Sequence, residues 1–381
     1  MKAFQVRAPH EFSLAQVETP VAAPGEVVVG VAYAGICGSD MHIIHGQNAF
    51  VRFPRVTGHE FAGVVQEVGE GVETLSVGDH IIHGQNAFVR FPRVTGHEFA
   101  GVVQEVGEGV ETLSVGDRVC VDPVISCGTC YPCRIGRPNV CTHLQVIGVH
   151  RDGGFSERVS VPAENAHKLP EGMPLSHAAL VEPYSIALNV LDRMQPQPGD
   201  SVLVYGAGVI GLTIVQMARA LGLTDITVTD VIDRRLQTAR ALGATRTING
   251  QAQDVESVMK EQTGGEGVPL IVDAACIPAL MPQMVRLASP AGRIGLLGFN
   301  AAPSDLVQLE MIKKELTLVG SRLNNRKFPR VIELMATGKL NAQDLISHRV
   351  AFDDMPEAID LIESHPEQTR KVLVELMHVA G

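Results

Sequence analysis

The chain contains no tryptophan, few aromatic residues and no excess of basic charge. Aromatic residues make up 4% of its 381 residues, and 31 lysines and arginines face 42 aspartates and glutamates, for a formal net charge of −11. Without a basic face the chain cannot neutralise phosphates, so we expect no nucleic-acid or anionic-membrane partner. It also lacks a run of about eighteen apolar residues, which excludes an obvious membrane-spanning helix.

The first twelve residues show no basic segment followed by an apolar one, so we expect no secretory signal and a cytoplasmic protein. What is present is typical of a folded α/β chain: 45% hydrophobic residues, 19% charged residues and 38 glycines. The length allows two domains, each with a core of its own. A small molecule is therefore the expected partner.

One segment occurs twice without a single change. Residues 42–79 recur as residues 80–117, so 38 residues stand in tandem. Repeat proteins drift between units, and they need several units to bury a core. The pattern indicates a recent duplication or a sequence artefact inside a framework that requires one copy. Looping out the spare copy would cost on the order of 3 kcal/mol, and its apolar strand has no evident partner.

The pattern of apolar and polar residues changes near Glu182. Before it, short apolar segments punctuated by Pro and Gly predict a barrel-like β domain, with strands at 27–32, 98–106, 118–121 and 156–161. After it, apolar strands alternate with helical periodicity, as in βαβ units on a parallel sheet. We expect strands at 201–205, 226–229, 270–272 and 293–297, and helices at 211–221, 234–242, 327–336 and 355–363.

A glycine-rich turn follows an apolar strand at VLVYGAGVIG. Gly206 permits a tight turn, Gly208 lets the backbone approach a pyrophosphate, and Gly211 lets the next helix pack closely on the strand. The helix N-terminus, which includes Val209 and Ile210, then faces the phosphates. The turn predicts a dinucleotide site, the alternative being a glycine-rich turn without a ligand.

An acidic residue at the end of the next strand predicts which dinucleotide binds. Asp230 follows Gly211 by nineteen residues. A carboxylate there accepts hydrogen bonds from the ribose hydroxyls and repels a 2′-phosphate, which favours NAD over NADP. Arg234 and Arg235 could soften that preference, and we include Arg235 among the cofactor-binding candidates.

Four cysteines fall within fifteen residues: Cys127, Cys130, Cys133 and Cys141. In a reducing compartment such a cluster indicates a metal site before it indicates disulfides. Four thiolates at this spacing predict a closed tetrahedral zinc site, which braces a loop and does no chemistry. An iron–sulfur cluster is the competing prediction, but the last gap and the missing Cys-Pro fit it poorly.

A second set of metal-binding residue types is spread along the chain: Cys37 in GICGSD, His59 and Glu60 in GHE, and Glu182 in VEPYSIA. A catalytic zinc takes about three protein ligands with mixed donor atoms and keeps one position open. Each residue alone has an ordinary structural explanation, since a lone buried cysteine is usually a small hydrophobe. The prediction depends on their occurrence together with the cysteine segment and the glycine-rich turn.

The order of the motifs resembles that of the zinc-containing medium-chain alcohol dehydrogenases, over essentially the whole chain. The motifs are GICGSD, GHEFAGVVQEVGEGV, the four-cysteine segment, GVHRDGGFSE, VEPYSIA and YGAGVIG. The resemblance is closest to the polyol and sugar-acid branch, which includes sorbitol, threonine and hexonate 5-dehydrogenases and starvation-sensing relatives. It implies an α/β fold with three parts: a GroES-like β-rich catalytic domain (1–181), a Rossmann NAD-binding domain (182–320) and a C-terminal segment (321–381) that returns to the catalytic domain.

The resemblance also implies roles for individual residues. The ligands of the catalytic zinc would be Cys37, His59, Glu60 and Glu182, the last directly or through water, giving about two zinc ions per chain. Ser39 would take the proton of the substrate hydroxyl, with His42 at the outer end of the relay, and Arg322 would orient the substrate. Zinc would lower the pKa of that hydroxyl while hydride moves to NAD.

The duplication leaves the source of the His–Glu pair open, because each copy contains one: His59–Glu60 and His97–Glu98. The family's spacing from Cys37 favours His59, and its spacing to Cys127 favours His97. Only one pair can occupy one metal. We expect the first copy, since it keeps His42 beside Ser39.

We therefore expect an NAD-dependent zinc dehydrogenase that oxidises a secondary hydroxyl of a sugar acid or polyol and forms a homo-oligomer, a dimer or a tetramer. Two alternatives remain. One is a catalytically silent nucleotide-binding or regulatory protein whose active-site wall is spoiled by the insert. The other is a simple alcohol or aldehyde reductase, against which the low aromatic content and the pair Glu182 and Arg322 count.

Overall fold

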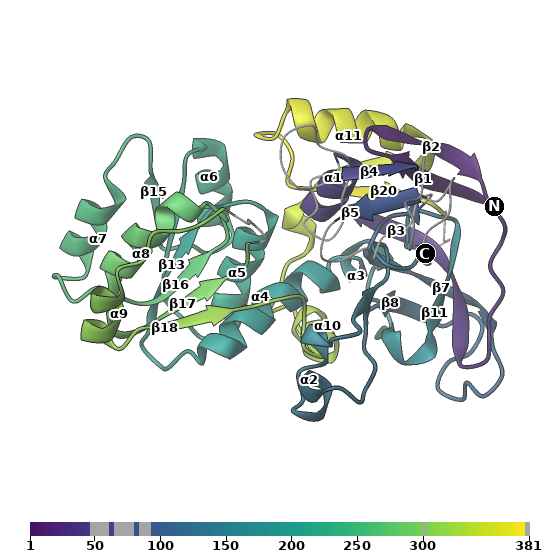
Figure 1. Ribbon diagram of the computed structural model, residues 1–381, viewed down its shortest axis with the longest axis horizontal. Coiled ribbons are helices and arrows are strands. Elements are labelled where there is room, and N and C mark those ends of the chain that lie inside the picture. Colours follow the sequence, from purple (N-terminus) through teal and green to yellow (C-terminus); the bar gives the residue numbers. More distant parts are fainter. Residues whose placement is uncertain (46–60, 65–79, 84–92, 299, 301, 378–381) are drawn as a thin grey trace, which may run out of the picture.

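The computed structural model describes residues 1–45, 61–64, 80–83, 93–298, 300 and 302–377. These residues form two lobes, each built around its own sheet (Figure 1). One lobe holds a six-stranded sheet with helices packed around it. The other holds a seven-stranded sheet that includes strands from both the N-terminal and the C-terminal parts of the chain. Among the described residues, no helix has both the length and the apolar character needed to cross a membrane.

The six-stranded sheet is parallel and has the order β15-β14-β13-β16-β17-β18. Its strands are β13 (Ser201–Tyr205), β14 (Asp225–Asp230), β15 (Arg246–Asn249), β16 (Val268–Asp273), β17 (Ala288–Leu296) and β18 (Thr317–Gly320). The helices are α5 (Val209–Ala220), α6 (Asp233–Ala241), α7 (Val255–Gln262), α8 (Met281–Leu287) and α9 (Gln308–Lys314). The strand order reverses between β13 and β16, and ligands of such sheets bind at the carboxyl ends of the strands beside that reversal.

The second sheet has the order β12-β8-β7-β3-β20-β19, with β11 also paired to β3. Its strands are β3 (Glu26–Ile36), β7 (Glu98–Val106), β8 (Arg118–Val121), β11 (Arg158–Pro162), β12 (Ala166–Lys168), β19 (Ile346–Ala351) and β20 (Lys371–Glu375). Strand β20 pairs with β3, Leu373 opposite Gly35, so the last part of the chain joins a sheet that the first part builds.

Smaller elements surround this sheet. Strands β1 (Lys2–Ala8), β2 (Glu11–Gln16) and β6 (Arg93–Val94) form a three-stranded sheet, and β9 (Val124–Ile125) pairs with β10 (Gln145–Val146). The helices of this part and of the junction between the lobes are α1 (Gly38–Ile44), α2 (Tyr131–Arg134), α3 (Leu175–Ala178), α4 (Val181–Met194), α10 (Phe328–Ala336) and α11 (Met355–Ser364).

Helix α4 is the main element that the sequence pattern failed to predict. Most of its residues are buried, including Asn189 near its middle and Glu182 near its start. Every strand and helix that the sequence predicted is present, with ends shifted by a few residues.

The two copies of the repeat are placed differently. The second copy supplies β6 and the whole of β7, in the middle of the seven-stranded sheet. From the first copy, β4 (Phe61–Val64) pairs antiparallel with β5 (His80–His83). We expected the spare apolar strand to lack a partner, and this was wrong: β5, from the start of the second copy, pairs with one of its edges.

Candidate functional site

The catalytic candidates meet where β3 ends and β7 begins. The strands are antiparallel with Gly35 opposite Glu98, so Cys37, just after β3, lies next to His97, just before β7. The Cys37 Sγ to His97 Nε2 distance is 3.6 Å although the residues are 60 positions apart. Gly35 makes room for this arrangement, because a Cβ there would lie 2.6 Å from Oε2 of Glu98. The strand register thus sets the distance between the thiol and the imidazole.

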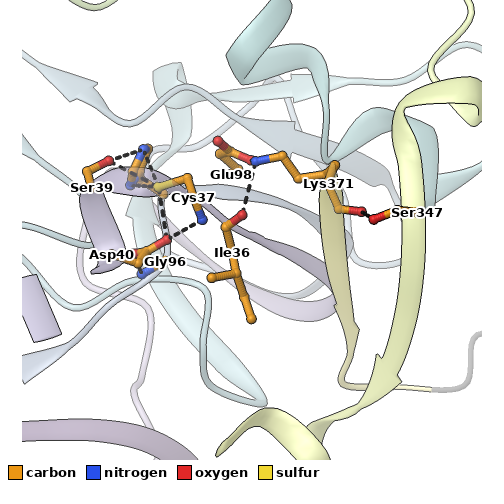
Figure 2. A network of polar contacts seen from close by, with 9 residues as sticks. Ile36, Cys37, Ser39, Asp40, Gly96, Glu98, Ser347 and Lys371 are labelled. Carbon is orange, nitrogen blue, oxygen red and sulfur yellow. Dashed lines mark hydrogen bonds and ion pairs between the residues drawn. The ribbon is translucent and has the colours of Figure 1, made fainter. Parts of the chain in front are cut away.

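Helix α1 holds Cys37 at its N-cap. Asp40, the third residue of the helix, accepts hydrogen bonds through Oδ2 from the backbone N–H and from the thiol of Cys37, both at 3.0 Å. Its Oδ1 accepts a hydrogen bond from the N–H of Gly96 at 3.2 Å (Figure 2). This buried carboxylate therefore ties the start of α1 to the turn that precedes His97.

Ser39 and His97 complete a close group with Cys37. The Ser39 Oγ lies 3.0 Å from Cys37 Sγ and 3.4 Å from His97 Nε2. His97 also belongs to two sets of potential metal ligands, whose ligand atoms lie within 4.8 Å of one another in each set. One set adds Cys37 and Asp40 to His97, and the other adds Glu98 and Glu182.

A buried ion pair borders this cluster. The Nζ of Lys371 donates a hydrogen bond to Oε2 of Glu98 and another, at 3.2 Å, to the carbonyl oxygen of Ile36 (Figure 2). Burial alone would lower the pKa of Lys371, but the negative charges of Glu98 and Cys37 outweigh burial and raise it. Lys371 therefore stays charged and balances part of the negative charge of the site.

Burial shifts the pKa of both Glu182 and Cys37 toward the uncharged form. Burial raises the pKa of Glu182 to about 8, a shift that His97 opposes and Glu98 reinforces. Burial also raises the pKa of Cys37, with the charges of Asp40 and Glu98 adding to it. A dication bound among these groups would stabilise the carboxylate and the thiolate and reverse both shifts.

The donor atoms fit a zinc ion. A thiol, an imidazole and a carboxylate are the mixed ligands that a catalytic zinc takes. Cys37 lies within 4.8 Å of His97 in one set and Glu182 in the other, so His97 is the potential ligand that the two sets share. We expected His59 and Glu60 here, and these two residues lie outside the described part of the chain. The structure presents the second-copy pair, His97 and Glu98, at this position.

The four cysteines of the 127–141 segment also converge. The Sγ of Cys130 lies 3.4 Å from that of Cys133 and 3.6 Å from that of Cys141. All four sulfur atoms, including that of Cys127, lie within 4.8 Å of one another. In a tetrahedral site with Zn–S bonds of about 2.3 Å the sulfurs would be about 3.8 Å apart. Backbone hydrogen bonds, first that from Cys133, lower the pKa of Cys130 to about 5 and so favour a thiolate.

The glycine-rich turn lies at the carboxyl end of β13. Gly206 has a φ of +95°, which strains any residue with a side chain. A Cβ on Gly211 would lie 1.9 Å from the carbonyl oxygen of Gly206, so α5 approaches the turn this closely only with glycine. Among the described residues, none lies within 4 Å of a Cβ built on Gly208, and no side chain caps α5. The backbone N–H groups of Val209 and Ile210 are thereby left for a phosphate.

Asp230 lies beside that turn, at the end of β14. Its Oδ2 accepts a hydrogen bond from the N–H of Ala207 at 2.7 Å, and its Oδ1 accepts one from the N–H of Ile232 at 2.9 Å. The carboxylate is therefore fixed at the edge of the turn. Arg235 donates to the carbonyl oxygen of Pro366 at 3.1 Å, so this side chain contacts the C-terminal part of the chain.

Arg322 follows β18, in the segment that joins the two lobes. Its carbonyl oxygen accepts a hydrogen bond from Nδ2 of Asn139 at 2.8 Å, and Asn189 of α4 donates to the carbonyl oxygen of Leu323 at 3.0 Å. These bonds connect the segment to the four-cysteine segment, residues 127–141, and to α4, the helix that carries Glu182. Burial lowers the pKa of Arg322. The backbone of His42 lies in α1, and its side chain is outside the described part.

Sequence reasoning missed two charged residues of the site. Asp40 had a signal, because an acidic residue three positions after a helix N-cap commonly bonds the cap backbone. Lys371 had none. It comes next to Glu98 only because β20 pairs with β3, and the two residues are 273 positions apart.

Two family descriptions match the chain. Residues 23–87 and 80–171 each match the alcohol dehydrogenase GroES-like domain, and residues 209–337 match zinc-binding dehydrogenase. The GroES-like domain is thus matched twice, and each match contains one copy of the repeat. The duplication falls inside a single family domain.

Individual proteins are similar over the whole length. The starvation-sensing protein RspB of Escherichia coli K12 is 43% identical over 375 residues, which are 98% of this chain and 99% of RspB. L-galactonate-5-dehydrogenase of the same organism is 31% identical and covers 92% of each chain. A crystal structure of RspB from Escherichia coli CFT073, complexed with NADH, has a TM-score of 0.85 and 42% identity over 99% of each chain. The similarity therefore extends through both lobes.

Proposed function

Because the chain belongs to the zinc-type alcohol dehydrogenase family, with a GroES-like domain and a Rossmann-like parallel sheet, we propose that it transfers hydride from a secondary alcohol of a sugar acid or polyol to NAD. The observation that carries this proposal is the position of His97, whose ring nitrogen lies within 4.8 Å of the Cys37 thiol in one set of potential metal ligands and of the Glu182 carboxylate in a second set. We divide the chain at 1–181, 182–320 and 321–381 into catalytic, nucleotide-binding and returning parts.

We assign Cys37, His97 and Glu182 as the protein ligands of a catalytic zinc, with Glu98 next to them and paired to Lys371. Zinc, when bound, supplies the Lewis acidity that lowers the pKa of a substrate hydroxyl. The ion pair with Lys371 neutralises Glu98, so the site does not accumulate the charge of two free carboxylates. The four-cysteine lobe would hold the second, structural zinc of each chain.

Ser39 is the residue we assign to receive the substrate proton. Its Oγ lies near both Cys37 Sγ and His97 Nε2, at 3.0 and 3.4 Å, so a hydroxyl held between these ligands would be within reach of it. A serine hydroxyl both accepts and donates, so it can pass the proton outward. His42, three residues further along α1, is our candidate for the outward acceptor.

NAD binding is supported by the lobe that holds the six-stranded parallel sheet. The open space at Gly208 and the uncapped start of α5 suit a pyrophosphate, and Asp230 lies where the adenosine ribose of a dinucleotide would come. NAD, when bound, accepts the hydride. A carboxylate at this place disfavours the additional phosphate of NADP, which supports NAD as the preferred cofactor.

A polyhydroxylated substrate is supported by two observations. One relative is named L-galactonate-5-dehydrogenase and acts on a sugar acid by that name. In this chain, Arg322 keeps its cation in a partly buried segment that is tied to the helix of Glu182. A guanidinium is a good partner for the carboxylate of a sugar acid, which it can bind through two parallel hydrogen bonds.

We also propose a cytoplasmic homo-oligomer. Three apolar side chains are exposed on and beside α9: Val307 at 63%, Leu309 at 56% and Ile312 at 70%. The neighbouring strand β18 is the last of the six-stranded sheet, so its outer edge has no partner within the described chain. An apolar surface beside a free sheet edge suits contact with a second copy.

The experiment is a substrate panel with a metal analysis. Hexonates, polyols, threonine and simple alcohols are assayed with NAD and NADP, and zinc is counted per chain. We expect turnover of a sugar acid or polyol with NAD and about two zinc ions. Turnover of simple alcohols alone would contradict the substrate class. One zinc ion per chain with no turnover would favour the silent nucleotide-binding alternative.

A further inference from the structure

A cavity of about 340 Å³ lies where three parts of the chain meet. These parts are the four-cysteine segment, the second half of α4 and the residues just before α10. Every described residue that lines the cavity is polar or charged, and none of them is a catalytic candidate or belongs to the glycine-rich turn. The volume is at the small end of the range for small-molecule sites in proteins.

The charged groups of this cavity do not balance. The Nζ of Lys327 forms an ion pair with Oδ2 of Asp192 at 2.5 Å, so these two charges neutralise each other. The guanidinium groups of Arg137 and Arg193 have no hydrogen-bond or ion-pair partner among the described residues, and the Nε of Arg193 is covered from solvent. The cavity therefore has an excess of two positive charges.

Two asparagines in the wall are also incompletely satisfied. Asn139 is 3% exposed, and its Nδ2 donates to the carbonyl oxygen of Arg322 at 2.8 Å. The Nδ2 of Asn325 donates to the carbonyl oxygen of Gly136 at 3.0 Å. The Oδ1 of each asparagine accepts no hydrogen bond from a described residue, although most buried polar atoms in proteins have a partner. Such acceptors beside two guanidinium groups suit a ligand that has both hydroxyl groups and negative charge.

We propose that this cavity binds a small hydroxylated dianion through phosphate or carboxylate oxygens. A guanidinium presents parallel N–H donors that match either group. Arg137 and Arg193 together neutralise two negative charges, and Lys327 keeps its own partner in Asp192. The ligand has the size of a hydroxydicarboxylate or a small phosphate ester, because the volume is too small for a nucleotide.

The dianion connects segments that belong to the two candidate metal sites. Arg137 lies in the four-cysteine segment, and Arg193 lies on α4, the helix that carries Glu182. Glu182 and Arg193 are eleven residues apart, which is about three turns, so they lie on the same face of the helix. Between them, Asn189 donates to the carbonyl oxygen of Leu323 at 3.0 Å. A ligand held by both guanidinium groups therefore restrains the four-cysteine segment against the helix of Glu182.

The test is binding of inorganic phosphate and of malate to the full chain. Calorimetry and thermal unfolding are measured at constant ionic strength, with chloride as the reference anion, because surface charges respond to salt in general. We expect both probes to bind and to raise the Tm. Binding of phosphate alone would identify a phosphate ligand, and binding of malate alone would identify a carboxylate ligand.

Variants assign the binding to this cavity. Arg137→Gln and Arg193→Gln should each weaken binding at least 10-fold, because a charged hydrogen-bond partner is lost. Arg330→Gln is the matched control. It removes the same charge from an exposed arginine of α10 that pairs with Glu333, and it should bind like the unmodified chain. Anion binding at the glycine-rich turn is insensitive to all three changes, so only the component lost in the first two variants belongs to the cavity.

Two further measurements do not depend on the folding of the arginine variants. Asn325→Asp adds a negative charge to the wall and keeps both guanidinium groups, so it should also weaken binding. In the unmodified chain, phosphate should slow hydrogen–deuterium exchange in the peptide of residues 127–141. The proposal is overturned if neither probe binds more tightly than chloride, or if Arg137→Gln, Arg193→Gln and Asn325→Asp bind as tightly as Arg330→Gln.

Discussion

At the scale of single residues, the site depends on groups that position the reactive side chains and have no direct part in the proposed hydride transfer. Asp40 joins the thiol of Cys37 to the turn before His97, and Lys371 holds the carboxylate of Glu98. Gly35 contributes only the absence of a side chain, which leaves room for that carboxylate. The reactive side chains are positioned by these contacts, so conservative changes at Asp40 or Lys371 should act on metal affinity before they act on stability.

The first residue-scale prediction concerns the cofactor. Asp230→Ala should reduce kcat/KM with NAD by about 10- to 100-fold, because a charged hydrogen-bond partner contributes roughly 1.5–3 kcal/mol. The ratio of NAD to NADP turnover should narrow, since the charge that repels a 2′-phosphate is gone. Steady-state kinetics with both cofactors measure this.

Asp230→Asn is the matched control for that variant. It removes the charge but keeps an oxygen that can accept the hydrogen bond from Ala207, so it separates cofactor selection from the shape of the turn. Equal use of NAD and NADP by the unmodified protein would show that Asp230 does not have the role assigned to it.

The second residue-scale prediction concerns the number of protons that Glu182 releases when zinc binds. Since burial raises the pKa of Glu182 to about 8, its carboxyl is protonated at pH 7 in the metal-free site and ionised at pH 9. Zinc binding should therefore release more protons at pH 7 than at pH 9. Calorimetric titration of the metal-free protein in buffers of different ionisation enthalpy counts these protons.

Glu182→Gln is the control, because its amide has no proton to release in this range. The difference between the two pH values should shrink by about one proton in this variant. If the unmodified chain releases the same number of protons at pH 7 and pH 9, Glu182 does not bind the metal or is already ionised.

At the scale of elements, one amino-acid sequence forms two structures in this chain. HIIH closes helix α1 at residues 42–45 and forms strand β5 at residues 80–83. FAGV is part of β7 in the large sheet and, in the first copy, forms β4. Local propensity is the same in both copies, so the neighbours that each segment meets decide its conformation.

The element-scale prediction separates the two metal sites. Cys130→Ser removes one of four thiolates that hold the lobe together, so we expect one zinc ion to be lost and the Tm to fall by roughly 5 °C or more. Cys37→Ser should also remove one zinc ion, but it should abolish turnover with little change of Tm. Metal analysis, thermal unfolding and activity are measured on both variants. An unchanged Tm and zinc content in Cys130→Ser would remove the structural site.

At the scale of the whole molecule, the two lobes are joined by segments distant in sequence. Strand β20 adds the C-terminal part to the sheet of β3, and Arg235 of α6 contacts the carbonyl of Pro366. Residues 321–323 and helix α4 connect the four-cysteine segment, residues 127–141, to the candidate catalytic site. Only the intact chain can assemble these contacts, so truncation before β20 should remove Lys371 and destabilise the lobe that holds the seven-stranded sheet.

The first whole-molecule prediction is deletion of one copy. Removal of residues 42–79 or of residues 80–117 yields the same polypeptide, because the copies are identical. The connection before β6 then shortens from 47 residues to nine, which we expect to stabilise the protein by about 1.5 kcal/mol. Thermal unfolding, solubility and kcat/KM are compared with the full chain. A deleted protein that is less stable or inactive would show that the second copy is required.

The second whole-molecule prediction concerns assembly. Ile312→Asp places a charge on the exposed apolar surface of α9, so we expect it to weaken association of the chains. Light scattering coupled to size-exclusion chromatography measures the mass of the unmodified protein and of the variant. Val115→Asp, at an exposed valine of the turn before β8, is the control and should leave the mass unchanged. The assignment of α9 fails if the oligomer persists in Ile312→Asp.

The sequence by itself determined the chemistry and most of the local structure. Spacing identified the four-cysteine lobe, turn chemistry identified Gly206 and Gly211, and periodicity identified the alternation of strands and helices. These features depend on residues close together in the chain. Local spacing could not choose between His59 and His97, because both copies carry the same local information.

The tertiary structure decided what depends on distant residues. It placed His97 beside Cys37 through the pairing of β3 with β7, and Lys371 beside Glu98 through the pairing of β3 with β20. It also gave HIIH two conformations. The physical reason is the same in each case: which residues meet across a sheet is set by the pairing of strands that are distant in the sequence, and local sequence carries no information about that pairing.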